Sequence, residues 1–157
     1  WVATGQTGIM IGAHDGIVVD RVPADLAAGA VEDMVARVAT DHALLLVAGQ
    51  ASLTPRAYSG VTLSILHGSW PDAVVLADEP GRERRAHFES FPVAGVDSEV
   101  GLIEDLSAAE VAALSTWGDP QRERDRHGLP AADIYAEDGP EQLLAAIEDV
   151  LGARGDR

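Results

Sequence analysis

The residues that could do chemistry in this chain follow its short apolar runs. In open parallel sheets, ligands bind outside the carboxyl ends of the strands, so polar residues that directly follow an apolar run are candidates for a site. These candidates are Thr4, Gly5, Gln6, Thr7, Gly8, Asp20, Gly49, Gln50, residues 79–82 and residues 115–119. Their mixture of glycine, hydroxyl, amide and carboxylate groups suits a polar ligand better than a purely structural rim.

The segment Thr4–Gly8 is a glycine-bounded loop candidate. Its glycines let the backbone approach a ligand, and its N–H groups and two hydroxyls could bind an anion. The same residues could equally make a tight connection between two strands. Asp20 could hold a magnesium ion or a substrate ammonium. Near Glu79, Arg82 could clamp a carboxylate or a phosphate with two hydrogen bonds.

Two further side chains are candidates for acid–base chemistry. Asp25 precedes a helical pattern and is expected to be its N-cap, although one residue can serve both as a cap and as a base. His67 ends a short predicted helix and could act as an acid or base, but stabilisation by the helix dipole is the favoured explanation. The five histidines, His87 among them, show no H-x-x-x-H or H-E-x-x-H spacing, so we expect no histidine metal site.

Ser59 is a nucleophile candidate in a formal sense only. It lies between Tyr58 and Gly60, and the segment does not have the G-x-S-x-G pattern of a nucleophile elbow. We therefore expect Ser59 to cap a short helix over residues 61–67.

The elements that must position these residues alternate between apolar runs and helical patterns, which predicts an α/β fold with a mainly parallel sheet. Predicted strands are 1–3, 43–47, 73–77 and 111–115, and predicted helices are 25–40, 61–67, 100–106 and 140–152. The run 43–47 is expected to be covered on both faces. The first helix is expected to bury Leu26, Ala30, Val31, Met34 and Val38. Residues 83–97 have no firm period and are expected to be irregular.

Composition excludes several classes of function. The 157 residues carry 26 acids and 11 bases, all of them arginine, for a net charge of −15, and they include no cysteine. Disulfides, cysteine nucleophiles, Schiff bases and a G-x-x-x-x-G-K-[ST] loop are therefore absent from this sequence. The negative charge opposes binding to nucleic acid or anionic membrane surfaces. We expect an acidic, halophilic, cytoplasmic protein, with codon bias as the alternative source of the composition.

Four segments together resemble one family. They are WVATGQTGIMI at 1–11, GIVVDRVPADLAAGAVE at 16–32, AYSGVTL at 57–63 and LHGSWPDA at 66–73. In this order they are similar to a P-loop NTPase-like family of unknown function that includes a D-glutamate N-acetyltransferase. The resemblance is strong over residues 1–82, and it continues more weakly at 128–130 and in the last helix.

The resemblance implies the later part of one three-layer, P-loop NTPase-like α/β domain over residues 1–157. The first strand, the phosphate loop and an upstream Rossmann-like domain would lie outside this chain. It implies an N-acyltransferase with acetyl-CoA as donor and an amino-acid acceptor such as D-glutamate. We expect a small-molecule substrate, a homo-oligomer, and no nucleic-acid, membrane or resident metal partner.

The same resemblance assigns roles to residues. It places Thr4, Gly5, Gln6, Thr7, Gly8, Asp20, Asp25, Gln50, Tyr58, Ser59 and Gly60 on the substrate side. Asp20 or Asp25 would take the amine proton, and Arg82 could bind a substrate carboxylate.

Two departures keep alternatives open. Ala48 stands where relatives usually carry an acid that suits magnesium binding, and Ala51 stands where they carry glycine. An enzyme that uses ATP or GTP with Mg²⁺ is therefore the second hypothesis, and a non-catalytic nucleotide- or ligand-binding module is the third.

Overall fold

The computed structural model of the chain describes residues 1–85 and 88–155, so His87 lies outside the described residues. The chain folds into two compact units, which we name unit 1 (Trp1–Trp70) and unit 2 (Pro71–Arg157). The expectation of a single domain stays a prediction. None of the described helices is both long and apolar enough to cross a membrane.

Unit 1 is a small parallel sheet with helices. Its elements are β1 (Val2–Ala3), α1 (Gln6–Met10), β2 (Asp15–Gly16), the 3₁₀ turn η1 (Val19–Arg21), α2 (Ala27–Ala39) and α3 (Ser59–Ser69). β1 pairs in parallel with β2, so that Val2 lies opposite Asp15. On its other side, Val2 forms a parallel bridge with Val47. The predicted first strand is thereby confirmed.

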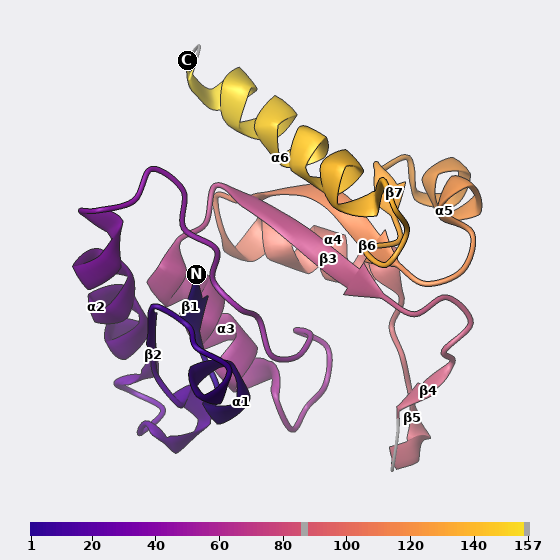
Figure 1. Cartoon of the computed structure of the whole chain (residues 1–157). Coiled ribbons are helices and arrows are strands. Elements are labelled where there is room, and N and C mark those ends of the chain that lie inside the picture. Colours follow the sequence, from indigo (N-terminus) through magenta and orange to yellow (C-terminus); the bar gives the residue numbers. More distant parts are fainter. Residues whose placement is uncertain (86–87, 156–157) are drawn as a thin grey trace. The chain divides into compact units, whose positions relative to one another are not determined.

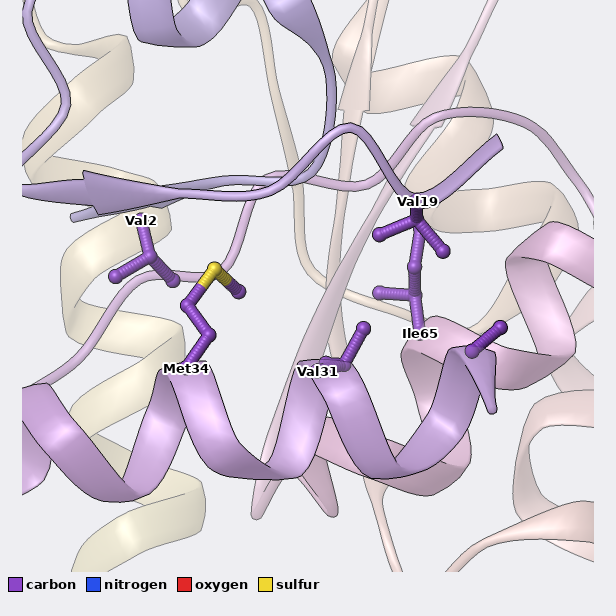
Figure 2. Packing of buried hydrophobic residues seen from close by; sticks show 6 residues of the cluster. Val2, Val19, Val31, Met34 and Ile65 are labelled. Carbon is purple, nitrogen blue, oxygen red and sulfur yellow. The ribbon is translucent and has the colours of Figure 1, made fainter. Parts of the chain in front are cut away.

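One hydrophobic cluster holds unit 1 together. Figure 2 shows Val2 and Val19 facing Val31 and Met34 of α2, with Ile65 of α3 beside them. Val31 and Met34 are three residues apart, which puts both on one face of the helix. The predicted apolar face of this helix is therefore correct at these two positions and at Val38, which packs against the same cluster, whereas Leu26 is exposed.

Close approach between α2 and α3 depends on a glycine. A Cβ atom at Gly68 would overlap the carbonyl oxygen of Ala28 and would lie 2.7 Å from the Cβ of Val31. Only a residue without a side chain therefore lets α3 pack this closely on α2.

The run 43–47 differs from the prediction of a strand covered on both faces. Val2 donates from its N–H to Leu46 O at 2.9 Å, and Ala48 donates to Val2 O at 3.0 Å. Val47 nevertheless forms only an isolated bridge, and Leu44 and Leu46 are 50% and 56% exposed. Leu45 and Val47 pack against the unit 1 cluster, so the segment is covered on one face and exposed on the other.

Both predicted helix caps are wrong. α2 begins at Ala27 with Leu26 as the N-cap, and no side chain, including that of Asp25, caps it. α3 begins at Ser59 with Tyr58 as the N-cap, so Ser59 is the first helical residue. Both helices are nevertheless present, and α3 continues to Ser69. This extension places His67 within the last turn.

The described residues of unit 2 form eight elements. They are β3 (Ala73–Asp78), β4 (Arg84–Arg85), β5 (Phe88–Pro92), α4 (Val96–Leu106), β6 (Glu110–Thr116), α5 (Pro120–His127), β7 (Ala131–Ala132) and α6 (Gly139–Gly155). The described strands β3, β6 and β7 form a parallel sheet in that order. The predicted strands 73–77 and 111–115 are therefore confirmed, each slightly longer than expected.

The sheet of unit 2 lies between two helices (Figure 1). Ala113 packs with Leu143 and Ala146 of α6, whereas its neighbour Leu114 packs with Val96 of α4. Successive strand residues point to opposite faces, so both faces of β6 carry small or apolar side chains.

Two predictions fail in unit 2, and one helix was not predicted at all. Residues 83–97 include the antiparallel pair β4–β5 and the start of α4. The segment after Trp117 contains the unpredicted helix α5, which Asp119 caps by accepting from the N–H groups of Gln121 and Arg122. α6 does not end at Gly152 but continues to Gly155.

Candidate functional site

A pocket of about 370 Å³ in unit 1 gathers part of the predicted site. Its volume lies within the range of small-molecule sites, which is about 300–1,000 Å³. The residues that line it are Ala3, Thr4, Gly5, Gln6, Thr7, Gly8, Asp20, Ala48, Gly49 and Gln50. Three separate predictions, the segment 4–8, Asp20 and Gln50, therefore meet in one place.

Thr4 forms the buried wall of this pocket. The residue is 1% exposed, and its hydroxyl donates to Ala48 O at 2.6 Å. Its carbonyl accepts from Val19 N–H at 3.0 Å and from the side-chain amide of Gln50. The Thr4 hydroxyl, which the sequence suggested as a ligand donor, is thus engaged in joining β1 to the segment 48–50.

The segment Thr4–Gly8 connects a strand to a helix, which corrects the alternative of a connection between two strands. Gly5 is the N-cap of α1 with extended backbone, and no side chain caps the helix. N–H groups in the first turn of a helix lack partners within that helix, so they are the natural donors at this wall. Gly8 has a packing role, because a Cβ there would lie 2.6 Å from the Cβ of Ala3.

The electrostatics of the pocket are sparse. Among the described residues that line it, Asp20 alone has an ionisable side chain, and it is exposed on η1. No arginine lines the pocket within the described part of the chain, so its charge favours an amine or a neutral polar group over a phosphate. In residues 1–85 and 88–155, no three His, Asp or Glu side chains gather closely enough to hold a metal ion.

Several predicted site residues of unit 1 do not line this pocket. Asp25 lies exposed in the turn before α2, and His67 is exposed in the last turn of α3. The segment Tyr58–Gly60 forms the start of α3, with Tyr58 exposed. The pocket is built from the end of β1, the first residues of α1, Asp20 of η1 and the segment 48–50, and α3 contributes no lining residue.

Glu79 and Arg82 belong to unit 2 and pair with each other. Arg82 Nη2 lies 2.6 Å from Glu79 Oε2, and Arg82 N–H donates to Glu79 O at 3.2 Å. Both side chains are about half exposed. The guanidinium predicted to clamp a ligand thus already has a carboxylate partner within its own turn.

Sequence reasoning missed a charged cluster at the carboxyl end of β3. His127 places Nδ1 at 2.5 Å from Asp97 Oδ1 and Nε2 at 3.4 Å from Glu123 Oε2. The His127 and Glu123 side chains are almost fully buried. Burial raises the pKa of the nearby Asp78, and the charge of Glu123 raises it further, against the opposing charges of His127 and Arg126. The four-residue spacing of Glu123 and His127 was the signal in the sequence that could have indicated this pair.

Residues 1–144 match the model of a family described as "Domain of unknown function (DUF1611_C) P-loop domain". Two curated relatives are named D-glutamate N-acetyltransferase. The relative from Tritonibacter scottomollicae is 42% identical over 104 residues, which is 66% of this chain and 28% of the relative. The relative from Pseudoalteromonas sp. is 43% identical over 102 residues, or 64% and 30% respectively.

A solved structure is also similar. It is described as a DUF1611 family protein from Anabaena variabilis ATCC 29413, and it matches with a TM-score of 0.86 and 29% identity. The match covers 94% of this chain and 47% of that chain. The chain spans less than a third of the length of the two curated relatives, and about half of the solved chain.

Proposed function

Because the chain belongs to the DUF1611 family of P-loop domains and has their α/β fold, we propose that it forms part of an N-acetyltransferase. The proposed reaction transfers an acetyl group from acetyl-CoA to the amine of an amino acid. The names of the two curated relatives make D-glutamate the first acceptor to test.

The observation that carries this proposal is the unit 1 pocket, which is lined by the carboxylate of Asp20 and by three glycines. An acceptor amine must lose a proton when its nitrogen attacks the thioester carbon, and Asp20 is the base that lines the pocket. The carbonyl oxygen gains negative charge in that step, and N–H groups of residues 5–8 are the donors for it. As the tetrahedral intermediate collapses, the C–S bond breaks and the thiolate leaves as the free thiol of CoA after taking up a proton.

The pocket does not fit the phosphates of the acetyl donor. Its described lining residues include no arginine, and the chain has no lysine. We therefore derive no phosphate contact from these residues, and the proposal concerns the acceptor side and the reacting atoms only.

The test uses the protein that carries this chain, at the full length of the curated relatives. It is mixed in high salt with acetyl-CoA and a panel of D- and L-amino acids, and free thiol is measured. Thiol release that depends on one amino acid is the expected result. Asp20→Asn should lower the rate by about 10²- to 10⁴-fold.

Two matched variants sharpen this test. Asp41→Asn removes an exposed carboxylate of unit 1 that does not line the pocket, and it should leave the rate unchanged. Asp25→Asn tests the other predicted base and should also retain activity, since Asp25 lies outside the lining. Full activity of Asp20→Asn would refute the assignment of Asp20 as the base. If no amino acid of the panel caused thiol release, and ATP or GTP with Mg²⁺ raised the melting temperature, the nucleotide-dependent alternative would be favoured.

A further inference from the structure

A second pocket, of about 260 Å³, lies in unit 2. Its floor is apolar, with Ala113 and Ala132 from the sheet and Leu143 and Ala146 from α6. Three polar side chains complete the lining, and they are Arg124, Gln142 and Asp149. The pocket therefore combines a small aliphatic floor with one cationic, one amide and one anionic group.

Arg124 is incompletely satisfied at this pocket. Its Nε is buried without a hydrogen-bond partner, and its Nη2 reaches only Gln142 Oε1, at 3.5 Å. Within residues 1–85 and 88–155, no carboxylate forms an ion pair with it. A guanidinium has five N–H donors, and a buried donor without a partner costs free energy.

The neighbouring carboxylates are engaged elsewhere. Glu123 Oε2 faces His127 Nε2 at 3.4 Å, and Asp125 Oδ1 accepts from the Gln121 amide at 2.8 Å. Asp149 lines the same pocket without forming an ion pair with Arg124. The Arg124 guanidinium and the Asp149 carboxylate thus line the same pocket but do not form an ion pair with each other.

We propose that this pocket binds a small α-amino acid, with the ligand carboxylate on Arg124 and the ligand ammonium at Asp149. The aliphatic carbons of the ligand cover the alanine floor. A simple anion fits less well, because it would face Asp149 and a chain with a net charge of −15. A zwitterion has no net charge, and it supplies a partner to each of the two charged groups.

The experiment titrates the whole chain with D- and L-alanine, without any acetyl donor, and follows the amide resonances of Ala131, Ala132 and Ala146. Propionate and ethylamine serve as ligands that carry one charge each. We expect saturable shifts with alanine, and affinities at least tenfold weaker for both half-ligands. Propionate that binds as tightly as alanine would overturn the amino-acid assignment, and so would the absence of saturable shifts.

Variants test the role of the guanidinium. Arg124→Gln should weaken alanine binding by about 10- to 100-fold, since a hydrogen bond to a charged group contributes about 1.5–3 kcal/mol. Arg122→Gln, on the same helix but outside the pocket lining, is the matched control and should leave binding unchanged. Equal binding by Arg124→Gln and the wild type, both shown to be folded by their amide spectra, would refute the proposal. The readout is independent of thiol release, so the acetyltransferase proposal can fail without affecting it.

Discussion

The two units place polar groups at the carboxyl ends of their strands in different ways. At the end of β1, unit 1 uses backbone, hydroxyl and amide groups, and Asp20 is the one ionisable side chain among the described lining residues. At the end of β3, unit 2 has Asp78 beside the buried pair Glu123 and His127. Unit 1 thus leaves a pocket with little charge, whereas unit 2 buries charge among its own helices.

This difference shows what each arrangement can do. In unit 1, Thr4 and Gln50 hold the pocket wall through bonds that do not depend on pH. In unit 2, both ring nitrogens of His127 face carboxylate oxygens, of Asp97 and Glu123. The first arrangement leaves polar groups facing a pocket, whereas the second uses charged side chains to hold α5 against α4.

The largest expected effects come from the separate cores. Leu114→Ala removes a fully buried side chain from unit 2, and Met34→Ala does the same in unit 1. Each should lower the free energy of unfolding by about 2–5 kcal/mol, because transfer energy is lost and a cavity remains. Hydrogen exchange should show the loss of protection mainly in the mutated unit.

The Leu114→Ala variant also tests whether the two units unfold separately. If Leu114→Ala lowers the protection of α2 amides as much as that of β6 amides, the two units unfold as one body. Their separate cores would then not describe separate stabilities. Gly29→Ala is a useful control, because no atom lies within 4 Å of the added Cβ and alanine favours a helix by about 1 kcal/mol.

The sequence predicted an element correctly where pattern and tertiary partners agree. The runs 73–77 and 111–115 are strands because they pair with each other and because β6 has apolar contacts on both faces. The run 43–47 has the same apolar pattern, yet within the described residues its backbone pairs only with Val2. Composition of a run therefore predicts extended backbone, and its neighbours decide whether it becomes a strand.

Helix α5, in contrast, forms where the sequence pattern predicted no element. Its sequence, PQRERDRH, has no apolar period, so hydrophobic patterning could not find it. The helix faces the protein with Glu123 and His127, whose partners include each other and Asp97 from α4. The sequence offered its end signals, Asp119-Pro120 at the start and Gly128 after the last turn, and the four-residue spacing of Glu123 and His127.

The candidate site was partly predictable. The family resemblance drawn from four motifs is confirmed. The rule that ligands bind at strand ends brought the segment 4–8, Asp20 and Gln50 together. It could not tell that the hydroxyl of Thr4 is committed to Ala48, because that bond joins residues 44 positions apart. The catalytic and binding roles stay predictions.

An intermediate effect is expected for the pocket wall. Thr4→Val keeps the shape of the side chain but removes the hydroxyl that donates to Ala48 O. The unpaired carbonyl should cost about 1–3 kcal/mol of unfolding free energy. Thr4→Ser keeps the hydroxyl and should lose about 1 kcal/mol for the missing methyl group. Only the valine variant should shift the amide resonances of Gly49 and Gln50, and equal shifts in both variants would contradict this role.

The smallest effects are electrostatic, and they have opposite signs in the two units. In unit 2 the pKa of Asp78 is raised above 3.8, so the folded state keeps a proton that the unfolded state loses. Stability from this group therefore falls as pH rises from 3.8 through the raised pKa. In unit 1 the pKa of Asp15 is lowered by the N–H of Gly16 and then by Arg37, so its contribution is lost as pH falls below 3.8.

Carboxyl carbon resonances followed against pH should give a pKa above the ordinary value for Asp78 and a pKa below it for Asp15. Each contribution should stay under about 1 kcal/mol, because solvent screens partly exposed charges. Asp78→Asn should remove the part of the pH dependence of hydrogen-exchange protection in unit 2 that arises from Asp78. Asp15→Asn should remove the corresponding part in unit 1. Both carboxyls titrating on the same side of 3.8 would contradict the contrast, because the surroundings of Asp78 and Asp15 would then act on a carboxylate in the same way.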